Sequence, residues 1–188
     1  MPIPKKGLIF ELLLQIKFLI VAFINFTYSV IPFFFLKKLF LRLFKIKLGA
    51  KTYIHRGVKF FHIGNITIGH NSVINFGCYL DNRREIFIGN NVGIAHNTKI
   101  YTLGHDLNDP EFGTKGSRVT INDNVFVFSN CMIMPGITIG EGAVILPGSI
   151  VTKDVSPYTI VGGNPAKYIK DRTAEINYSI NYGYWYAL

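Results

Sequence analysis

Aliphatic side chains recur every six residues through the middle of the chain, and turn-forming residues such as Pro135-Gly136 lie between them. Shorter runs with the same spacing are Ile88–Ile94–Ile100 and Ile68–Ile74–Leu80. A six-residue period fits neither a helix nor a simply alternating strand. The longest run has six members: Ile121, Val127, Ile133, Ile139, Ile145 and Val151.

This period predicts a coil of triangular cross-section, in which each side is a short strand and each corner is a tight turn. The aliphatic residue points inward and stacks on its equivalent one coil away. Because one coil cannot bury its own apolar face, several must stack. Residues 54–160 would supply about five coils of about eighteen residues. A β-sandwich of short strands is the alternative, but sandwiches do not keep so strict a period. The expected fold class is therefore mainly β.

The period breaks at two places. The two shorter runs are out of phase by two residues near Arg83-Arg84, and a longer interruption covers residues 103–118. We expect the longer segment to leave the coil as a protruding loop. It contains His105 in the sequence YTLGHDLNDPEF, where Gly104 lets the chain turn outward.

The first fifty residues follow a different pattern, which predicts apolar and amphipathic helices. Residues 18–36 carry no charge, and residues 36–48 alternate basic residues with Leu and Phe. Three interpretations remain open: a monotopic anchor or re-entrant hairpin, a transmembrane span, or helices that simply pack on the coil. We expect three parts: a helical, membrane-associating segment (1–50), the coil domain (51–170) and an aromatic tail (171–188).

The net charge of +9 is concentrated in that first part. Up to Lys59 there are eleven Lys and Arg and one acid, Glu11, whereas the rest of the chain has nine basic and ten acidic residues. Basic residues interleaved with Phe and Leu suit an anionic membrane surface better than nucleic acid. The five aromatic residues between Tyr178 and Tyr186 suit a membrane interface and a subunit interface equally.

The two cysteines, Cys78 and Cys131, form neither a disulfide framework nor a zinc-site spacing. Both fall at corner positions of the coil and are interpreted as small core residues. No small-residue cleavage site follows the first apolar stretch. These features favour a reduced, cytoplasmic setting.

The segment from Ile121 to Lys170, which ends in VGGNPAKYIK, resembles the hexapeptide-repeat acyltransferases. The similarity is to maltose, galactoside and colanic acid O-acetyltransferases, and it covers roughly residues 50–170. It implies a left-handed β-helix, a homotrimer with active sites between subunits, acetyl-CoA as co-substrate and no metal. The long apolar-basic N-terminal segment departs from family members that act on free sugars, and it points away from small soluble acceptors.

The resemblance also implies site residues. His105 would be the general base, and Asn75 of the NF pair would act with it and contact the acceptor, together with Asp81 and Asp106. The pKa of histidine lies near neutral pH, which suits removal of a proton from an attacking hydroxyl. Asp106 or a backbone carbonyl would hold the imidazole tautomer. The residues implied for CoA binding are Ser129, Pro147, Gly148, Thr152, Lys153, Lys167 and Lys170.

The leading hypothesis is an O-acetyltransferase of bacterial surface-polysaccharide biosynthesis, located in the cytoplasm at the inner face of the cell membrane. Its acceptor would be a sugar, a nucleotide sugar or a lipid-linked glycan. Two alternatives remain open. One is an N-acetyltransferase of an amino sugar or xenobiotic, and the other is a non-catalytic β-helix scaffold. His96, one coil before the loop, is a further histidine of interest.

Overall fold

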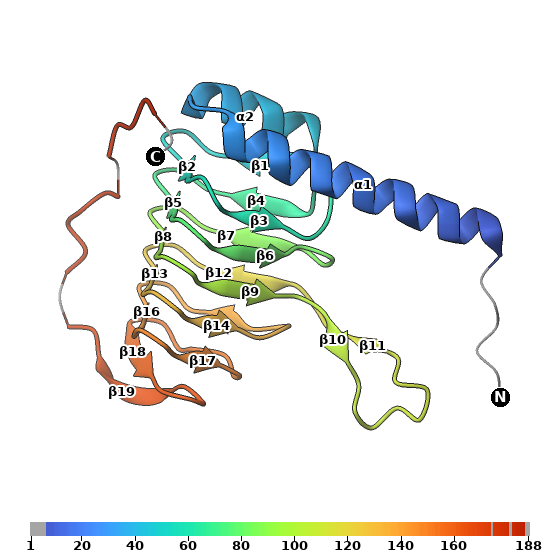
Figure 1. Ribbon diagram of the computed structural model, residues 1–188. Coiled ribbons are helices and arrows are strands. Elements are labelled where there is room, and N and C mark those ends of the chain that lie inside the picture. Colours follow the sequence, from blue (N-terminus) through green and yellow to red (C-terminus); the bar gives the residue numbers. More distant parts are fainter. Residues whose placement is uncertain (1–6, 174, 181, 187–188) are drawn as a thin grey trace.

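The computed structural model describes residues 7–173, 175–180 and 182–186, and it shows a parallel β-helix capped by two helices (Figure 1). Helix α1 (Leu8–Val30) and helix α2 (Phe34–Leu43) lie across one end of the coil. The expected fold class, a mainly β coil of hexapeptide repeats with an N-terminal helical segment, is confirmed.

Three parallel sheets form the faces of the coil. The first face contains β1 (Ile46–Leu48), β4 (Ile66–Ile68), β7 (Ile86–Ile88), β12 (Val119–Ile121) and β15 (Thr138–Ile139). The second contains β2 (Tyr53–Ile54), β5 (Val73–Ile74), β8 (Gly93–Ile94), β13 (Phe126–Val127), β16 (Val144–Ile145) and β18 (Thr159–Gly162), with β19 (Lys167–Asp171) antiparallel at its edge. The third contains β3 (Lys59–Phe60), β6 (Tyr79–Asp81), β9 (Lys99–Tyr101), β14 (Met132–Ile133) and β17 (Ile150–Val151).

The chain turns at three corners in every coil. The first corner joins the first face to the second, the second corner joins the second face to the third, and the third corner returns to the first face. Ile66 pairs with Ile86, so the early coils advance by twenty residues, whereas Thr120 pairs with Thr138, so the later coils advance by eighteen. The two additional residues lie at the third corner, which explains the phase shift near Arg83-Arg84.

The core is a column of stacked aliphatic side chains. Ile88, Ile121 and Ile139 are fully buried and occupy matching positions of successive coils. The backbones stack closely at the first corner, where a Cβ on Gly69 would lie 2.7 Å from the carbonyl carbon of Gly89. Burial of apolar side chains is the main favourable contribution to such a stack.

The cap is fixed to the first coil by buried contacts from both helices. Ile24, Tyr28 and Leu41 pack into the core, and the Tyr28 hydroxyl donates to the Ile54 carbonyl. Lys37 is only 1% exposed; its Nζ donates to the Tyr28 carbonyl (2.9 Å) and lies 3.9 Å from the centre of the Tyr28 ring. The cap therefore closes the open end of the apolar column.

Two further elements leave the coil. A hairpin of β10 (Gly104–His105) and β11 (Thr114–Lys115) projects from the third corner between β9 and β12. After β19 the tail runs back along the coil toward the cap (Figure 1). It is held on the way by Asn91, whose Nδ2 donates to the Tyr178 carbonyl and whose Oδ1 accepts from the Ile180 amide.

Candidate functional site

The hairpin presents His105 at the end of β10, opposite Thr114 of β11. Its turn is built around Asp109, whose carboxylate accepts hydrogen bonds from the amides of Glu111 and Gly113. Phe112 has a positive φ of 50°, a conformation that is uncommon for a bulky residue. This turn directs the Phe112 carbonyl and ring toward His105.

The His105 imidazole is oriented by Phe112 in two ways. Its Nδ1 lies 2.7 Å from the Phe112 carbonyl oxygen, and its ring stacks on the Phe112 ring with centroids 4.4 Å apart and planes 6° apart. A carbonyl oxygen only accepts hydrogen bonds, so Nδ1 must carry the proton. In the neutral ring Nε2 then has a free lone pair, as a general base requires. The side chain is exposed and can meet a substrate.

Asp106 does not orient the imidazole. Its carboxylate pairs with Lys115 Nζ (2.9 Å) and accepts from the Asn108 amide. The Lys115 hydrogen bond and then the amide bond hold the pKa of this carboxyl below its usual value. Of the two partners that the sequence left open for the histidine, the structure therefore shows the backbone carbonyl.

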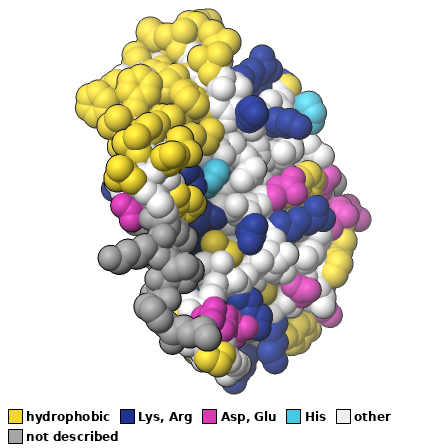
Figure 2. All heavy atoms as spheres, turned by 90° about the vertical axis from the view of Figure 1, so that its right-hand side faces the viewer, with side chains coloured by type: hydrophobic (Ala, Val, Ile, Leu, Met, Phe, Trp, Pro, Cys, Tyr) yellow, Lys and Arg dark blue, Asp and Glu magenta, His cyan; other side chains and the backbone are white. Residues whose placement is uncertain are grey.

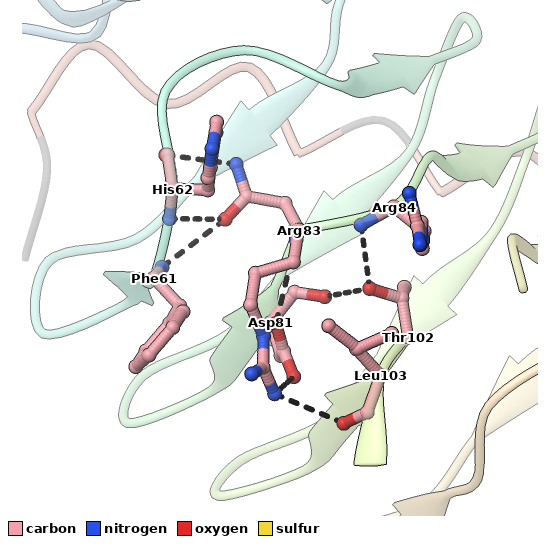
Figure 3. Close-up of polar contacts among 8 residues, drawn as sticks. Phe61, His62, Asp81, Arg83, Arg84, Thr102 and Leu103 are labelled. Carbon is pink, nitrogen blue, oxygen red and sulfur yellow. Dashed lines mark hydrogen bonds and ion pairs between the residues drawn. The ribbon is translucent and has the colours of Figure 1, made fainter. Parts of the chain in front are cut away.

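A partly buried ion pair supports the base of the hairpin (Figure 3). Asp81 is 1% exposed, and its two carboxylate oxygens accept from Arg83 Nε (2.8 Å) and Arg83 Nη2 (2.7 Å). The same Nη2 donates to the Leu103 carbonyl (2.9 Å), two residues before His105. The guanidinium also lies 4.8 Å from the centre of the Phe61 ring. Arg83 therefore ties the preceding coil to the strand that carries the histidine.

Neighbouring polar groups complete this corner. Thr102 Oγ1 donates to the Asp81 carbonyl and accepts from the Arg84 amide. The Asn82 side chain bonds to the backbone of Phe61 and His62 in the coil before. The hydrogen bond with Asp81 raises the pKa of Arg83, which stays charged. The corner is thus a satisfied polar network beneath the hairpin.

Asn75 lies at the second corner, a full face away from the hairpin. Its Nδ2 donates to the Ile94 carbonyl (3.2 Å). The next residue, Phe76, stacks on His96 with centroids 5.6 Å apart and lies 4.6 Å from the His55 ring centre. No hydrogen bond or ring contact joins Asn75 or His96 to His105 among the described residues.

The residues implied for CoA binding divide between the same two corners. Ser129, Pro147 and Gly148 lie at the second corner, where the Gly148 amide donates to the Ser129 carbonyl (3.0 Å). Thr152 and Lys153 lie at the third corner, and they line a cleft of about 370 Å³. Further residues around this cleft are Ser156, Pro165, Lys167 and Tyr168.

Lys170 lies outside that cleft, in a second hollow with Ile160 and Arg172. Both cysteines are buried, and burial raises the pKa of the Cys78 thiol to about 12. A thiol so resistant to ionisation is a poor nucleophile. Among the residues that the structure describes, no group of three or more His, Cys, Asp or Glu could hold a metal ion.

The third corner runs without a break from the hairpin to the cleft lined by Thr152 and Lys153. Ile100 aligns with Ile133 and Ile133 with Val151, so Tyr101 stands two coils away from Thr152 along the same edge. His105 follows Tyr101 by four residues. The third corner thus carries His105 and part of the implied CoA groove, whereas the second corner carries Asn75 and the other residues implied for that groove.

The fold agrees with that of known proteins. The family description "Bacterial transferase hexapeptide (six repeats)" matches residues 118–153. A maltose O-acetyltransferase structure from Clostridium difficile 630 is 31% identical, with a TM-score of 0.77 over 85% of this chain and 88% of that one. The chain belongs to the hexapeptide-repeat acetyltransferase family.

Two other acetyltransferases are similar to this chain. The galactoside O-acetyltransferase of Escherichia coli K12 is 35% identical over 127 residues, which is 65% of this chain and 62% of that protein. A hexapeptide-repeat acetyltransferase of Vibrio cholerae O1 biovar eltor, solved with acetyl coenzyme A, is 26% identical, with a TM-score of 0.77 over 82% of this chain and 86% of that one. The match to the E. coli enzyme thus spans less than two thirds of its length.

Sequence reasoning did not identify two elements of this site. The Phe112 carbonyl is a backbone group, so the residue type at this position does not predict its contact with His105. The two-residue phase shift at Arg83-Arg84 marks this position in the sequence, but it indicates only a break in the repeat and not the ion pair of Arg83. Both carboxylate oxygens of Asp81 accept hydrogen bonds from Arg83, and its expected contact with the acceptor stays a prediction.

Proposed function

We propose that this protein transfers an acetyl group from acetyl-CoA to a hydroxyl of a sugar or glycan, with His105 as the general base. The observation that carries the proposal is the Nδ1 contact with the Phe112 carbonyl, which leaves Nε2 free to accept a proton. The printed names of the relatives, galactoside and maltose O-acetyltransferase, support a sugar acceptor.

The mechanism requires one proton transfer and no enzyme-bound acyl group. Nε2 of His105 takes the hydroxyl proton while the acceptor oxygen bonds to the thioester carbon. The carbon–sulfur bond then breaks, and the imidazolium returns the proton to the CoA sulfur. Asn75 would contact the acceptor or the developing oxyanion. The cationic Lys153 and Lys167 suit the anionic nucleotide end of CoA.

The division of the site between two corners favours assembly from two copies of the chain. His105 leaves the third corner on a projecting hairpin, whereas Asn75 lies at the second corner. A second copy placed against the hairpin would bring its own second corner to His105. We therefore propose a homotrimer in which each active site lies between neighbouring subunits.

The cellular location and the biosynthetic pathway of this protein depend on which acceptor it uses. We propose that the acceptor is a nucleotide sugar or lipid-linked glycan of bacterial surface-polysaccharide synthesis. Because acetyl-CoA is a cytoplasmic metabolite, the coil would then work in the cytoplasm, at the inner face of the cell membrane.

The test is acetyl transfer by the purified full chain to a panel of free sugars, nucleotide sugars and lipid-linked glycans. His105→Ala should lower the rate by roughly 10²–10⁴-fold, the usual contribution of a general base. His70→Ala, at an exposed first-corner histidine, should leave it unchanged. The product should be an ester that mild base hydrolyses, since an amide would indicate an amino acceptor. Full activity of His105→Ala would exclude the mechanism.

A further inference from the structure

The cap exposes a large apolar surface to solvent (Figure 2). On α2, Phe35, Leu39 and Leu43 are exposed on the side that faces away from the coil. Figure 2 shows hydrophobic side chains gathered over this end of the molecule, with Lys and Arg beside them. The α1 members of this apolar cap surface are Leu8, Ile9, Leu12, Leu13, Leu19, Phe23, Phe26 and Val30.

Helix α1 is attached to the coil by its C-terminal half only. Val21, Ile24 and Tyr28 are buried, and the Asn25 side chain bonds to both the amide and the carbonyl of Phe60. No side chain of Leu8–Ile20 is buried. By length and composition the whole 23-residue helix could cross a membrane. However, the part without buried side chains rises only about 20 Å at ~1.5 Å per residue, against roughly 30 Å of hydrocarbon.

The tail brings aromatic residues to the border of this surface. The Phe34 amide donates to the Trp185 carbonyl (3.2 Å), and the rings of Phe33 and Tyr186 lie 5.2 Å apart. Trp185 is 81% exposed, and Tyr182 and Tyr186 are also exposed. Tyr and Trp, with apolar rings and polar tips, concentrate at the headgroup depth of membranes.

Cations lie beside this border and at another edge of the cap, where Lys45 and Lys47 line a hollow with Leu43 and Phe44. Lys38 and Lys51 line a cleft of about 700 Å³ together with Phe33, Tyr53 and Trp185. Arg42, Lys45 and Lys47 are exposed nearby in the chain. Each cation near an anionic bilayer adds about 1 kcal/mol of attraction.

We propose that the apolar cap surface binds an anionic phospholipid bilayer, with α1 and α2 lying in the interface and the tail aromatics at headgroup depth. The combination of an apolar centre, an aromatic border and a cationic margin is that of a monotopic membrane surface. A second copy is a poorer occupant, because two cationic margins would face and repel each other. This inference does not depend on the proposed acetyl transfer.

Co-sedimentation of the full chain with vesicles tests the proposal. Protein in mild detergent is diluted into phosphatidylcholine vesicles with or without phosphatidylglycerol. Binding should be strong with phosphatidylglycerol and weaken with salt. Leu19→Gln and Phe23→Gln should each weaken it about tenfold or more, from the lost burial of one apolar side chain. Ile169→Gln, an exposed apolar site on β19 at the opposite end, is the matched control. Equal binding of all variants would overturn the proposal.

The single tryptophan, Trp185, gives a second readout. Its emission should shift to the blue only when vesicles are present, and lipids brominated near the headgroup should quench it. A shift that grows with protein concentration without vesicles would show that a second copy covers the surface instead. Deep quenching of a fluorophore at Leu13→Cys, by lipids brominated at the chain ends, would show a span and overturn the interfacial placement.

Discussion

At the residue scale, His55 and His105 show how surroundings divide one side-chain type between two roles. His105 is exposed, and its Nδ1–H donates a hydrogen bond to the Phe112 carbonyl, so its Nε2 can accept a proton. His55 is 2% exposed, lies among the rings of Phe34, Phe76 and Tyr184, and its Nδ1 has no hydrogen-bond partner in the described part of the chain. The apolar, aromatic surroundings of His55 disfavour protonation of its imidazole.

His55 should make folding stability sensitive to acid. Burial, then the charges of Lys37 and His96, lower its pKa to about 4. The unfolded chain takes up this proton as the pH falls through about 6.5, while the folded protein resists it until about pH 4. This contribution to stability is therefore complete above pH 6.5 and lost on acidification, by roughly 2 kcal/mol at pH 5.

Urea unfolding of His55→Phe at pH 7.5 and pH 5 tests this expectation. The variant should lose less stability than the parent between the two values, because phenylalanine has no proton to bind. An unchanged slope in His55→Phe would contradict the assignment.

At the element scale, the hairpin depends on the coil beneath it. Its two strands share only the pairs Gly104–Lys115 and His105–Thr114, so its geometry needs outside support. Arg83 supplies it by donating to the Leu103 carbonyl while Asp81 holds the guanidinium. We expect Arg83 to be a positioning residue for His105.

Arg83→Lys should lower kcat for acetyl transfer by about tenfold, since a lysine cannot make the bidentate contact and also reach Leu103. KM for acetyl-CoA should not change, because the proposed CoA cleft lies two coils away. Arg84→Lys is the control, since only its backbone amide takes part in the corner. A parallel loss of stability with kcat unchanged would indicate a structural role only.

A double-mutant cycle separates the two roles open to Asp81. If Asp81 acts through Arg83, the effects of Asp81→Asn and Arg83→Lys on kcat should be strongly non-additive. If Asp81 instead contacts the acceptor, Asp81→Asn should raise KM for the acceptor and the effects should add.

The sequence predicted the elements better than their contacts. The stacking of Ile121, Ile139 and their equivalents follows from a spacing that only a coil can use. The gap in that spacing predicted that residues 103–118 protrude as a loop, but not that they form a hairpin. The ion pair of Asp81 with Arg83 did not follow, because a charged pair two residues apart is compatible with many surface turns. The role of Phe112 could not follow either, since it rests on a positive φ and a carbonyl.

At the scale of the whole molecule, the proposed active site needs two chains. His105 and Asn75 lie at different corners, so subunits defective at one position should complement subunits defective at the other. Co-expressed His105→Ala and Asn75→Ala chains should recover up to about one quarter of the parent's activity in mixed closed rings. Each variant alone is the control. No recovery would place both residues in one chain's site.

The tail links the two ends of the coil. Stacked repeats normally behave as a line of neighbours, and each end can fray without disturbing the other. Here the segment after β19 passes Asn91 in the third coil and ends against Phe33 and Phe34 of the cap. Local unfolding of the last coil should therefore weaken the contacts that the tail makes with the cap on the first coil. Hydrogen exchange should show the two ends opening together as one cooperative unit, where an untied array would open from either end separately.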